Sequence, residues 1–277
     1  MVLPKKIWFL WFQGLTNAPF IVKKCYQSWV ELNPDWEVIC LDETNLRNYI
    51  EPALSEQKLQ QLSKNHQSDL YRLQLLSNFG GVWVDSTTLC MIPINHWLYD
   101  YMDGGLFVFI HETRSYGWIS NWFIAAEQSH PITTKLNQKL TAFFRDNSFY
   151  HEGRIQQKRV KFLSRFLNRK FKTTRFWSSW LLIKTFKVYP YLIFHFMFAK
   201  LIGSDRECLK LYKKMPNFYT TGDILGQYGL LNPLTEEIKT RIDSKIDPVY
   251  KLSWKYDEKK YSDSSVLYYL LEEAKSE

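Results

Sequence analysis

The stretch SDLYRLQLLSNFGGVWVDSTT, residues 68–88, contains the charged residues that are the best candidates for binding or catalysis in this chain. At about 100° per residue, a helix would place Asp69 and Arg72 on the same side as the apolar Leu73 and Leu76. Charges that face a core must be paired, because an unpaired buried charge is costly. One interpretation is an i,i+3 ion pair that only stabilises the helix. The other is a polar pocket in which an acid and an arginine bind a ligand.

Asp85 stands where such a pocket is expected. It directly follows the apolar run Val82–Val84, which has the character of a buried strand, and a double glycine ends the helix before it. In sheets with parallel strands, ligands bind outside the carboxyl ends of the strands. A single aspartate at a strand end is most often a turn residue, but its combination with Ser-Asp-x-x-Arg and two glycines is more specific. We therefore predict that Asp69, Arg72 and Asp85 converge on one pocket.

The elements that must position these residues follow from apolar runs and turn signals. The predicted strands are residues 7–12, 37–41, 82–84 and 106–110; the predicted helices are residues 21–32, 42–62 with a break at Pro52, 66–79, and one that starts within 121–131 and resumes after Pro131. This alternation predicts an α/β fold with a mostly parallel central sheet flanked by helices. We expect residues 1–277 to form a single domain.

Charge and composition limit the kinds of molecule that this protein is expected to bind and the compartment in which it is expected to work. The net charge of +8 favours an anionic partner, which leaves a nucleotide, nucleic acid or anionic lipid open. The four cysteines show no Cys-x-x-Cys spacing, so we expect neither a zinc site nor a disulfide scaffold, and a reducing cytoplasm fits. The apolar run from Ile7 to Phe12 follows two lysines but is too short for a signal peptide, and we interpret it as a strand.

A basic and aromatic segment follows Gly153. From Arg154 to Lys187 the sequence has no Asp or Glu, and Phe and Trp alternate with Lys and Arg. No uncharged span reaches the roughly 20 residues needed to cross a bilayer. The segment fits peripheral contact with anionic lipid, but it also fits a solvated basic helix packed on the core. A third hypothesis is a nucleic-acid-binding surface, which would leave Asp69, Arg72 and Asp85 unexplained.

Residues 68–90 resemble the signature block of the capsular polysaccharide synthesis glycosyltransferases, allied to glycosyltransferase family 32 and more distantly to the large glucosylating toxins. That block runs Ser-Asp-x-x-Arg, a helix, then Gly-Gly-apolar-aromatic-apolar-Asp-x-Asp. The segments LPKKIWFLWFQG, NPDWEVICLD, NWFIAAEQSHPI and YKLSWK are also similar to parts of these enzymes. The resemblance covers residues 1–145 and 215–256. It implies a GT-A-like, Rossmann-like fold, with residues 154–202 as a helical insertion.

The resemblance also implies roles for individual residues. Asp69 and Arg72 would hold hydroxyls of the donor sugar or its ribose, and Asp85 would bind the ribose and a metal; these three form the implied catalytic set. The further donor-binding residues are Trp11, which would stack on a uracil base, Gly81, Thr87, Asn121 near the sugar or acceptor, and Ser253, Trp254 and Lys255 on a late loop over the diphosphate, with Lys251 or Lys255 adding positive charge. Simpler interpretations are core packing for Trp11 and a helix cap for Asn121.

Thr87 departs from the family pattern, because it stands where the second acid of Asp-x-Asp is expected. That acid helps to bind Mn²⁺ or Mg²⁺, hard cations that prefer oxygen ligands. A coordination shell with one carboxylate from Asp85 and the hydroxyl of Thr87 would bind such an ion much more weakly than two carboxylates would. Basic side chains are the alternative means of neutralising a departing diphosphate. The sequence leaves the need for a metal open.

The function that the resemblance implies is transfer of a sugar from a nucleotide diphosphate, UDP first among the candidates, to a hydroxyl of a growing oligosaccharide, with retention of configuration. The implied acceptor is a capsular or exopolysaccharide oligosaccharide on an undecaprenyl-type lipid. The protein would then work in the cytoplasm at the inner face of the cell membrane, without nucleic acid as a partner. The alternatives are an inactive relative that only binds a sugar nucleotide, and a nucleic-acid-binding protein.

Overall fold

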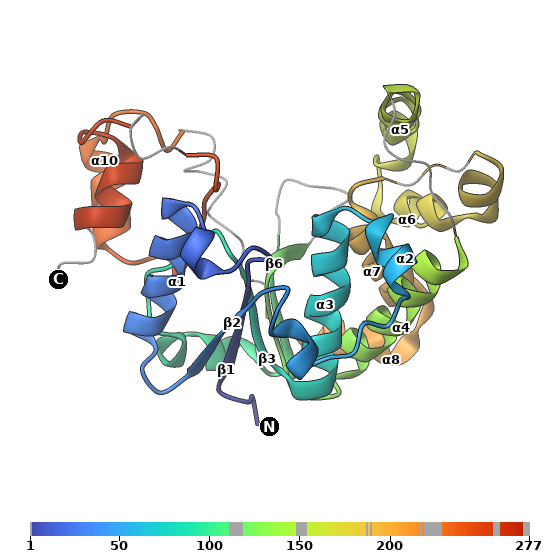
Figure 1. The fold of residues 1–277 in the computed structure, drawn as a ribbon, viewed down its shortest axis with the longest axis horizontal. Coiled ribbons are helices and arrows are strands. Elements are labelled where there is room, and N and C mark those ends of the chain that lie inside the picture. Colours follow the sequence, from blue (N-terminus) through green and yellow to red (C-terminus); the bar gives the residue numbers. More distant parts are fainter. Residues whose placement is uncertain are drawn as a thin grey trace.

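The structure is a computed structural model that describes residues 2–110, 119–147, 154–186, 188, 190–216, 218, 229–256 and 261–273. A central sheet has the strand order β2-β1-β3-β6-β5, and a second, two-stranded sheet pairs β4 with β7. The strands are β1 (Lys6–Leu10), β2 (Glu37–Leu41), β3 (Gly81–Asp85), β4 (Thr88–Cys90), β5 (Leu106–Ile110), β6 (Ile119–Ala126) and β7 (Val249–Lys251). Figure 1 shows helices on both sides of the central sheet.

The central sheet is mixed, which corrects the expectation of a mostly parallel one. β1 pairs in parallel with β2 and β3, whereas β6 is antiparallel to both β3 and β5. A parallel pair needs a crossover of a dozen or more residues. Only residues 111–118 separate β5 from β6, so these neighbours run in opposite directions.

Side chains of the central strands alternate between two cores, as the pleat of a strand requires. In β1, Trp8 and Leu10 belong to the core shared with α3 and α4, whereas Ile7 and Phe9 belong to the core shared with α1 and the C-terminal segment. All four residues are buried. The alternation decides which side chains of β3 face α3.

The helices are α1 (Phe20–Leu32), α2 (Glu56–Gln60), α3 (Lys64–Phe79), α4 (Pro131–Asp146), α5 (Arg154–Leu167), α6 (Phe171–Thr174), α7 (Ile193–Ser204), α8 (Arg206–Tyr212), α10 (Glu236–Asp243) and α11 (Val266–Tyr268). Short 3-10 turns are η1 (Leu15–Asn17), η2 (Leu46–Asn48), η3 (Ile94–His96), η4 (Leu98–Tyr101) and η5 (Arg175–Ser178), and π-helical turns are η6 (Leu181–Thr185) and η8 (Tyr269–Glu273). In Figure 1, α1 lies on one side of the sheet, and α3, α4 and α7 lie on the other.

Helix α3 begins and ends with local signals. The side chain of Ser63 accepts a hydrogen bond from the backbone N–H of His66, which satisfies one of the free donors of the first turn. Gly80 ends the helix with φ of 66°, and Gly81 follows with φ of 94°. A Cβ at Gly81 would lie 2.5 Å from the carbonyl oxygen of Lys6 in the neighbouring strand. Glycine is therefore required for β3 to pass this close to β1.

Two predicted helices are much shorter in the described structure than the sequence indicated. Within residues 42–62 there are only η2 and α2, because the Asp42 carboxylate accepts bonds from the backbone N–H groups of Thr44 and Asn45 and forms a turn instead. Residues 121–126 form part of β6, and the helix starts only at Pro131. Pairing with β3 and β5 outweighs the helix propensity of Ala125 and Ala126.

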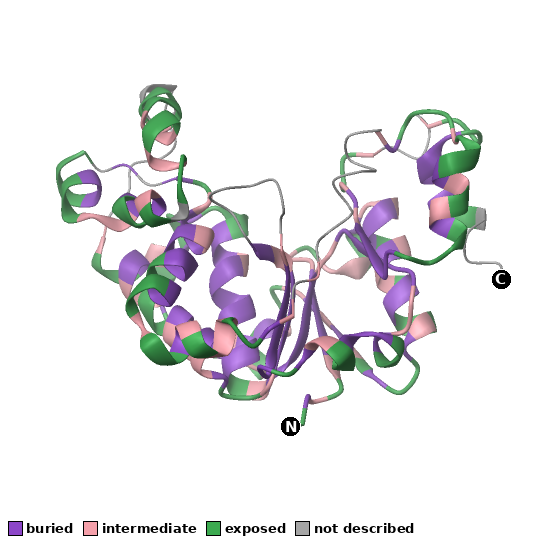
Figure 2. Ribbon diagram, turned by 180° about the vertical axis from the view of Figure 1, so that it is seen from behind, coloured by how far each residue is buried: buried purple, intermediate pink, exposed green. Residues whose placement is uncertain are grey.

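The basic and aromatic segment folds as α5, α6, η5 and η6, and α7 follows it in the chain. Trp177 is fully buried and stacks on Phe196 of α7, with ring centroids 5.8 Å apart. α5 is mostly exposed where its side chains are described, as Figure 2 shows. Among the described residues, the longest apolar helices fall short of what a bilayer crossing needs.

Candidate active site

β3 delivers Asp85 to the carboxyl edge of the sheet. Trp83 and Asp85 are two residues apart, so their side chains share the face toward α3. The indole Nε1 of Trp83 donates a hydrogen bond of 3.0 Å to Asp85 Oδ1. Asp85 is also the register partner of Leu10, the last residue of β1. The acid is thus fixed at the point where two parallel strands end.

α3 places Asp69 and Arg72 against this carboxylate. Arg72 Nη2 lies 3.2 Å from Asp69 Oδ1 and 3.3 Å from Asp85 Oδ1, so a single guanidinium bridges both acids. The side chains of Arg72 and Asp69 are only 5% and 8% exposed, whereas that of Asp85 is 26% exposed. The structure therefore brings together the three residues that the sequence placed in one pocket, and Asp85 is the most open of them.

Asp69, Arg72 and Asp85 form a charged cluster, and Asn121 of β6 contacts it on its buried side. Its Nδ2 donates to Asp69 Oδ1 at 3.0 Å, and its backbone carbonyl accepts a hydrogen bond from Arg72 Nη1. Arg72 also lies over the rings of Trp83 and Phe194, at 5.0 Å and 5.8 Å from their centroids. Asn121 is a strand residue here, not the helix cap of the simpler interpretation. Its contacts hold the acid and the arginine in one orientation.

Lys251 contributes a second cation from the far end of the chain. Its Nζ lies 2.9 Å from Asp85 Oδ2 and donates a hydrogen bond of 2.8 Å to Thr87 Oγ1. β7 presents it there, because Lys251 is the register partner of Thr88 in the β4–β7 ladder. The sequence named this lysine only as extra positive charge for the diphosphate. Its partners could not be predicted, because 166 positions separate it from Asp85.

The two carboxylates differ in their affinity for a proton. Burial raises the pKa of Asp69 to about 6, although Arg72 and the amide of Asn121 act in the opposite direction. Burial would also raise the pKa of Asp85, but Lys251 and Arg72 outweigh it and lower the value to about 2. Asp85 is therefore ionised at neutral pH, whereas Asp69 changes its charge close to neutral pH.

Trp11 lies at the same edge, directly after β1, and its backbone N–H donates to the carbonyl of Leu41 at the end of β2. Its indole Nε1 is buried and has no hydrogen-bond partner among the described residues. A buried donor without an acceptor is rare, and an acceptor on a ligand at this edge would satisfy it. Gly81, in contrast, is explained by its backbone geometry and lies at the amino end of β3.

The loop after β7 carries the remaining predicted residues. The N–H of Leu252 donates to the carbonyl of Thr87 at 2.7 Å, which holds this loop beside the tip of β3. Ser253 Oγ accepts a bond from the N–H of Lys255, and Lys255 lies 5.8 Å from the ring centroid of Trp254. Trp254 is 52% exposed. These side chains border the cluster and have no described contact with its carboxylates.

The donor set at the tip of β3 does not fit a tightly bound divalent cation. Among the described residues, no group of three or more His, Cys, Asp or Glu side chains is placed to hold a metal ion. Asp85 is the one acid of the Asp-Ser-Thr tip, and both of its oxygens already contact cations: Arg72 at Oδ1 and Lys251 at Oδ2. Hard cations need several oxygen ligands, and Thr87 supplies only a hydroxyl that Lys251 already occupies.

Fold and site together define an α/β protein with a mixed sheet and a compact charged cluster at the carboxyl end of its central strands. A family model described as "Capsular polysaccharide synthesis protein" matches residues 2–152, which is more than half of the 277 residues. The chain belongs to this family. The matched region contains Asp69, Arg72, Asp85 and Asn121 but ends well before Lys251.

Curated relatives share a shorter segment. The chain is 33% identical over 94 residues to the O-glycosyltransferase braB of Annulohypoxylon truncatum, which covers 30% of this chain and 22% of that protein. It is 33% identical over 93 residues to the glycosyltransferase afumC of Aspergillus fumigatus, which covers 29% of this chain and 24% of that protein. The matches thus span about a quarter of the relatives' length.

One solved structure, a PaToxG glycosyltransferase, aligns with a TM-score of 0.38 and 15% identity over 80% of this chain and 82% of that chain. A likeness this distant says nothing about a shared site. Membership of glycosyltransferase family 32 and the detailed GT-A architecture stay predictions of the sequence.

Proposed function

We propose that this protein is a glycosyltransferase that moves a sugar from a nucleotide diphosphate, with UDP as the first candidate, to a hydroxyl of a growing oligosaccharide. Membership of the capsular polysaccharide synthesis family and the two relatives named glycosyltransferases support this class of reaction. The observation that carries the proposal is the bridge that Arg72 makes between Asp69 and Asp85 at the carboxyl edge of the sheet. Ligands of open α/β sheets bind at this edge.

Each group of the cluster suits one part of such a donor. Asp69 and Arg72 would bind hydroxyls of the sugar, because a fixed carboxylate and guanidinium accept and donate in known directions. Asp85, the more exposed acid, would bind the ribose. Trp11 would stack on the base, and its unpaired indole N–H would donate to the nucleotide. Trp254 is exposed at the border of the cluster and would close over the bound donor together with Ser253 and Lys255.

The reaction would break the bond between the anomeric carbon and the β-phosphate oxygen and form a bond to the acceptor oxygen. The electron pair goes to the leaving phosphate, so stabilising its negative charge is the main electrostatic task. The acceptor proton would pass to that phosphate. We assign no enzymic nucleophile, and we propose an α-linked product from an α-linked donor, with retention of configuration.

A panel of UDP-, GDP- and CMP-sugars tests the proposal through donor hydrolysis and thermal shift. We expect one class of donor to raise the melting temperature and to be hydrolysed slowly. Arg72→Ala and Asp85→Ala should abolish both effects. The matched control is Arg206→Ala on α8, where the arginine is exposed. A Cβ at Gly104, just ahead of β5, would lie 3.0 Å from the carbonyl oxygen of Leu211 in the same helix, so α8 lies near the end of the sheet at which β3 and β5 begin. Full activity in either site variant would mean that the site lies elsewhere.

An inactive relative that only binds a sugar nucleotide is the second candidate. The observation that favours it is Thr87 in place of an acid at the tip of β3. Binding and turnover separate the two candidates, because the inactive relative would show the thermal shift without hydrolysis or transfer to any acceptor.

The acceptor that we propose is a lipid-linked oligosaccharide at the inner face of the cell membrane, and the basic and aromatic segment supports it. Of the large apolar side chains that are exposed among the described residues, more than half lie within residues 162–191. Phe162, Phe166 and Trp180 are 59%, 51% and 72% exposed, and the basic side chains around them face solvent as well. Exposed aromatics next to Lys and Arg suit the headgroup region of anionic lipid.

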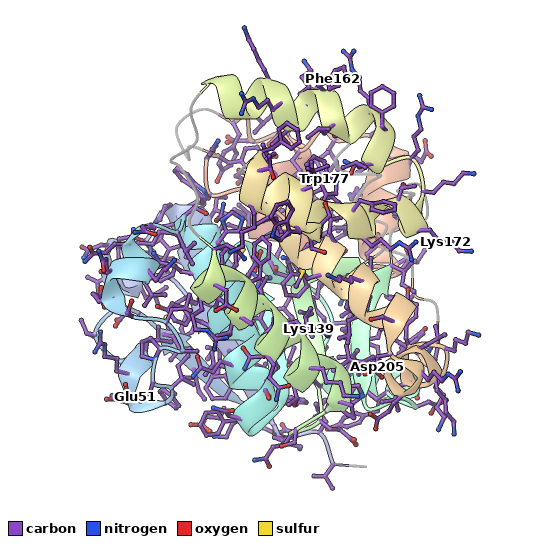
Figure 3. The ribbon with its side chains drawn as sticks, turned by 90° about the vertical axis from the view of Figure 1, so that its right-hand side faces the viewer. Glu51, Lys139, Phe162, Lys172, Trp177 and Asp205 are labelled. Atoms are coloured by element: carbon purple, nitrogen blue, oxygen red, sulfur yellow. The ribbon has the colours of Figure 1, made fainter. Side chains whose placement is uncertain are left out.

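This surface also contains an apolar cavity of about 320 Å³, lined by Arg159, Phe162, Leu163, Leu182, Phe186 and Val188. In Figure 3, Phe162 projects from α5 at the end of the molecule opposite Glu51. Figure 1 shows α5 beyond the end of the sheet at which β1 and β3 finish. A membrane at α5 would therefore present its lipid-linked sugars near the strand ends, on the side of the charged cluster.

Sedimentation with vesicles tests the membrane contact. We expect binding to vesicles that contain phosphatidylglycerol, little binding to pure phosphatidylcholine, and weaker binding at high salt. Equal binding to both vesicles, or to neither, would contradict the proposal. A gel shift with mixed oligonucleotides checks whether the basic and aromatic segment binds nucleic acid, and we expect no retardation at physiological salt.

A further inference from the structure

We propose that the ammonium group of Lys251 takes the place of a divalent cation and binds the diphosphate of the donor. This inference rests on the proposed function, because it assigns a residue to the diphosphate of a sugar nucleotide. It starts from the mismatch between the tip of β3 and a metal site. The tip has only one acid, Asp85, and Lys251 supplies a positive charge beside it in place of a metal ion.

The position of Lys251 is fixed by the fold. The β4–β7 ladder sets Lys251 opposite Thr88, and the N–H of Leu252 bonds to the carbonyl of Thr87. Its Nζ is held between Asp85 Oδ2 at 2.9 Å and Thr87 Oγ1 at 2.8 Å. These are the two side chains that would be metal ligands if residue 87 were an acid. The ammonium thus lies where their oxygens converge.

Replacing a second carboxylate and a divalent cation with Thr87 and Lys251 also preserves the formal charge of the site. A second carboxylate together with a divalent cation would carry one net positive charge. The hydroxyl of Thr87 together with the ammonium of Lys251 carries the same charge. The field that a departing diphosphate experiences is therefore similar in sign and size, and stabilising that charge is what the reaction requires.

The ammonium is able to reach a ligand. The side chain of Lys251 is 31% exposed, and that of its partner Asp85 is 26% exposed. An ammonium has three N–H donors, and Asp85 and Thr87 accept two of them, which leaves the third without an acceptor among the described residues. Lysine binds phosphate as a point charge on a flexible chain. Lys251 can therefore keep its contact with Asp85 while it binds a phosphate oxygen.

A purely structural ion pair explains less. Arg72 and Lys251 together balance the charges of Asp69 and Asp85, but the pair that Lys251 makes with Asp85 is partly open to solvent. A partly exposed ion pair contributes little to folding. Lys251 adds a positive charge at the open side of the cluster, the side from which a donor would enter.

Calorimetric titration with UDP distinguishes the lysine from a metal. The wild-type protein should bind UDP with the same Kd, within twofold, in EDTA and in millimolar Mn²⁺ or Mg²⁺. Lys251→Met keeps the length of the side chain but removes its charge, and it should weaken binding at least tenfold in EDTA. Lys251→Arg should retain most of the affinity. The matched control is Lys210→Met on α8, an exposed lysine far from the cluster, which should bind like the wild type.

The double variant Thr87→Asp, Lys251→Met restores the acid and removes the ammonium. It should recover UDP binding in Mn²⁺ and lose it in EDTA, which also shows that the variant is folded. A wild-type protein that loses UDP in EDTA, a Lys251→Met variant with unchanged affinity, or a double variant without metal dependence would each overturn the inference and leave the proposed function in place. If UDP, GDP and CDP bind in neither buffer, the proposed function falls and the inference falls with it.

Discussion

Replacing Asp69 with asparagine should make the protein more stable near neutral pH and inactive. The buried carboxylate has a pKa of about 6, whereas an unfolded chain has about 3.9. A pKa that is raised in the folded state contributes stability that is present below about pH 4 and lost as the pH rises to about 6. Above that pH the native state holds an ionised acid that its surroundings disfavour.

The size of the effect follows from the shift. About two pKa units at 1.36 kcal/mol each correspond to roughly 3 kcal/mol. The amide of the Asp69→Asn variant does not titrate, and its side-chain oxygen would still accept the hydrogen bond from Asn121 Nδ2. The free energy of unfolding of the variant, minus that of the wild type, should therefore rise by about 2 kcal/mol between pH 4.5 and 7.5, because part of the shift is already expressed below pH 4.5.

Urea unfolding followed by tryptophan fluorescence at several pH values between about 4.5 and 7.5 measures this difference. The control is Asp103→Asn, which removes an exposed carboxylate from a turn and should change stability by less than about 0.5 kcal/mol. A difference that is constant over this range, or that falls with pH, would refute the reasoning. A constant difference would mean that attraction to Arg72 cancels the effect of burial on the pKa of Asp69, and a falling one would mean that it outweighs that effect.

Three further changes test other parts of the structure. Arg72→Met leaves Asp69 buried without its cation, so it should cost about 3–5 kcal/mol of the free energy of unfolding in urea, as well as all transfer. Gly81→Ala should destabilise the protein by several kcal/mol, because its φ of 94° and the nearby carbonyl of Lys6 exclude a Cβ; Gly203→Ala in α7, where a Cβ would meet nothing within 4 Å, should be neutral or slightly stabilising. The pair Phe162→Ser and Trp180→Ser should lower binding to anionic vesicles at least tenfold in sedimentation without changing the hydrolysis of a soluble donor, and unchanged binding would separate this surface from the membrane.

The parts that the sequence predicted well depend on local patterns. The period of a helix was enough to put Asp69 and Arg72 on one side of α3, and a double glycine before an apolar run was enough to locate β3. Strand β2 has the predicted limits, Glu37–Leu41. In each case neighbouring residues carry the signal, so no knowledge of the tertiary contacts was needed.

The parts that the sequence missed depend on distant partners. The segment that begins at Asn121 was predicted to start a helix, yet its antiparallel neighbours β3 and β5 make it part of a strand. Lys251 was recognised as a charge but not as the partner of Asp85, since only the β4–β7 ladder brings them together. The mixed sheet was missed for the same reason.

The β4–β7 ladder has a consequence for the order of assembly. During synthesis, a ribosome releases Asp69, Arg72 and Asp85 long before residues 249–251 emerge. Until β7 docks, Asp85 would have Arg72 as its one cationic partner among the described residues. Competence to bind an anion would then appear abruptly, as a final step of maturation, and a chain stopped short of that strand would keep most of its core and lack the completed site.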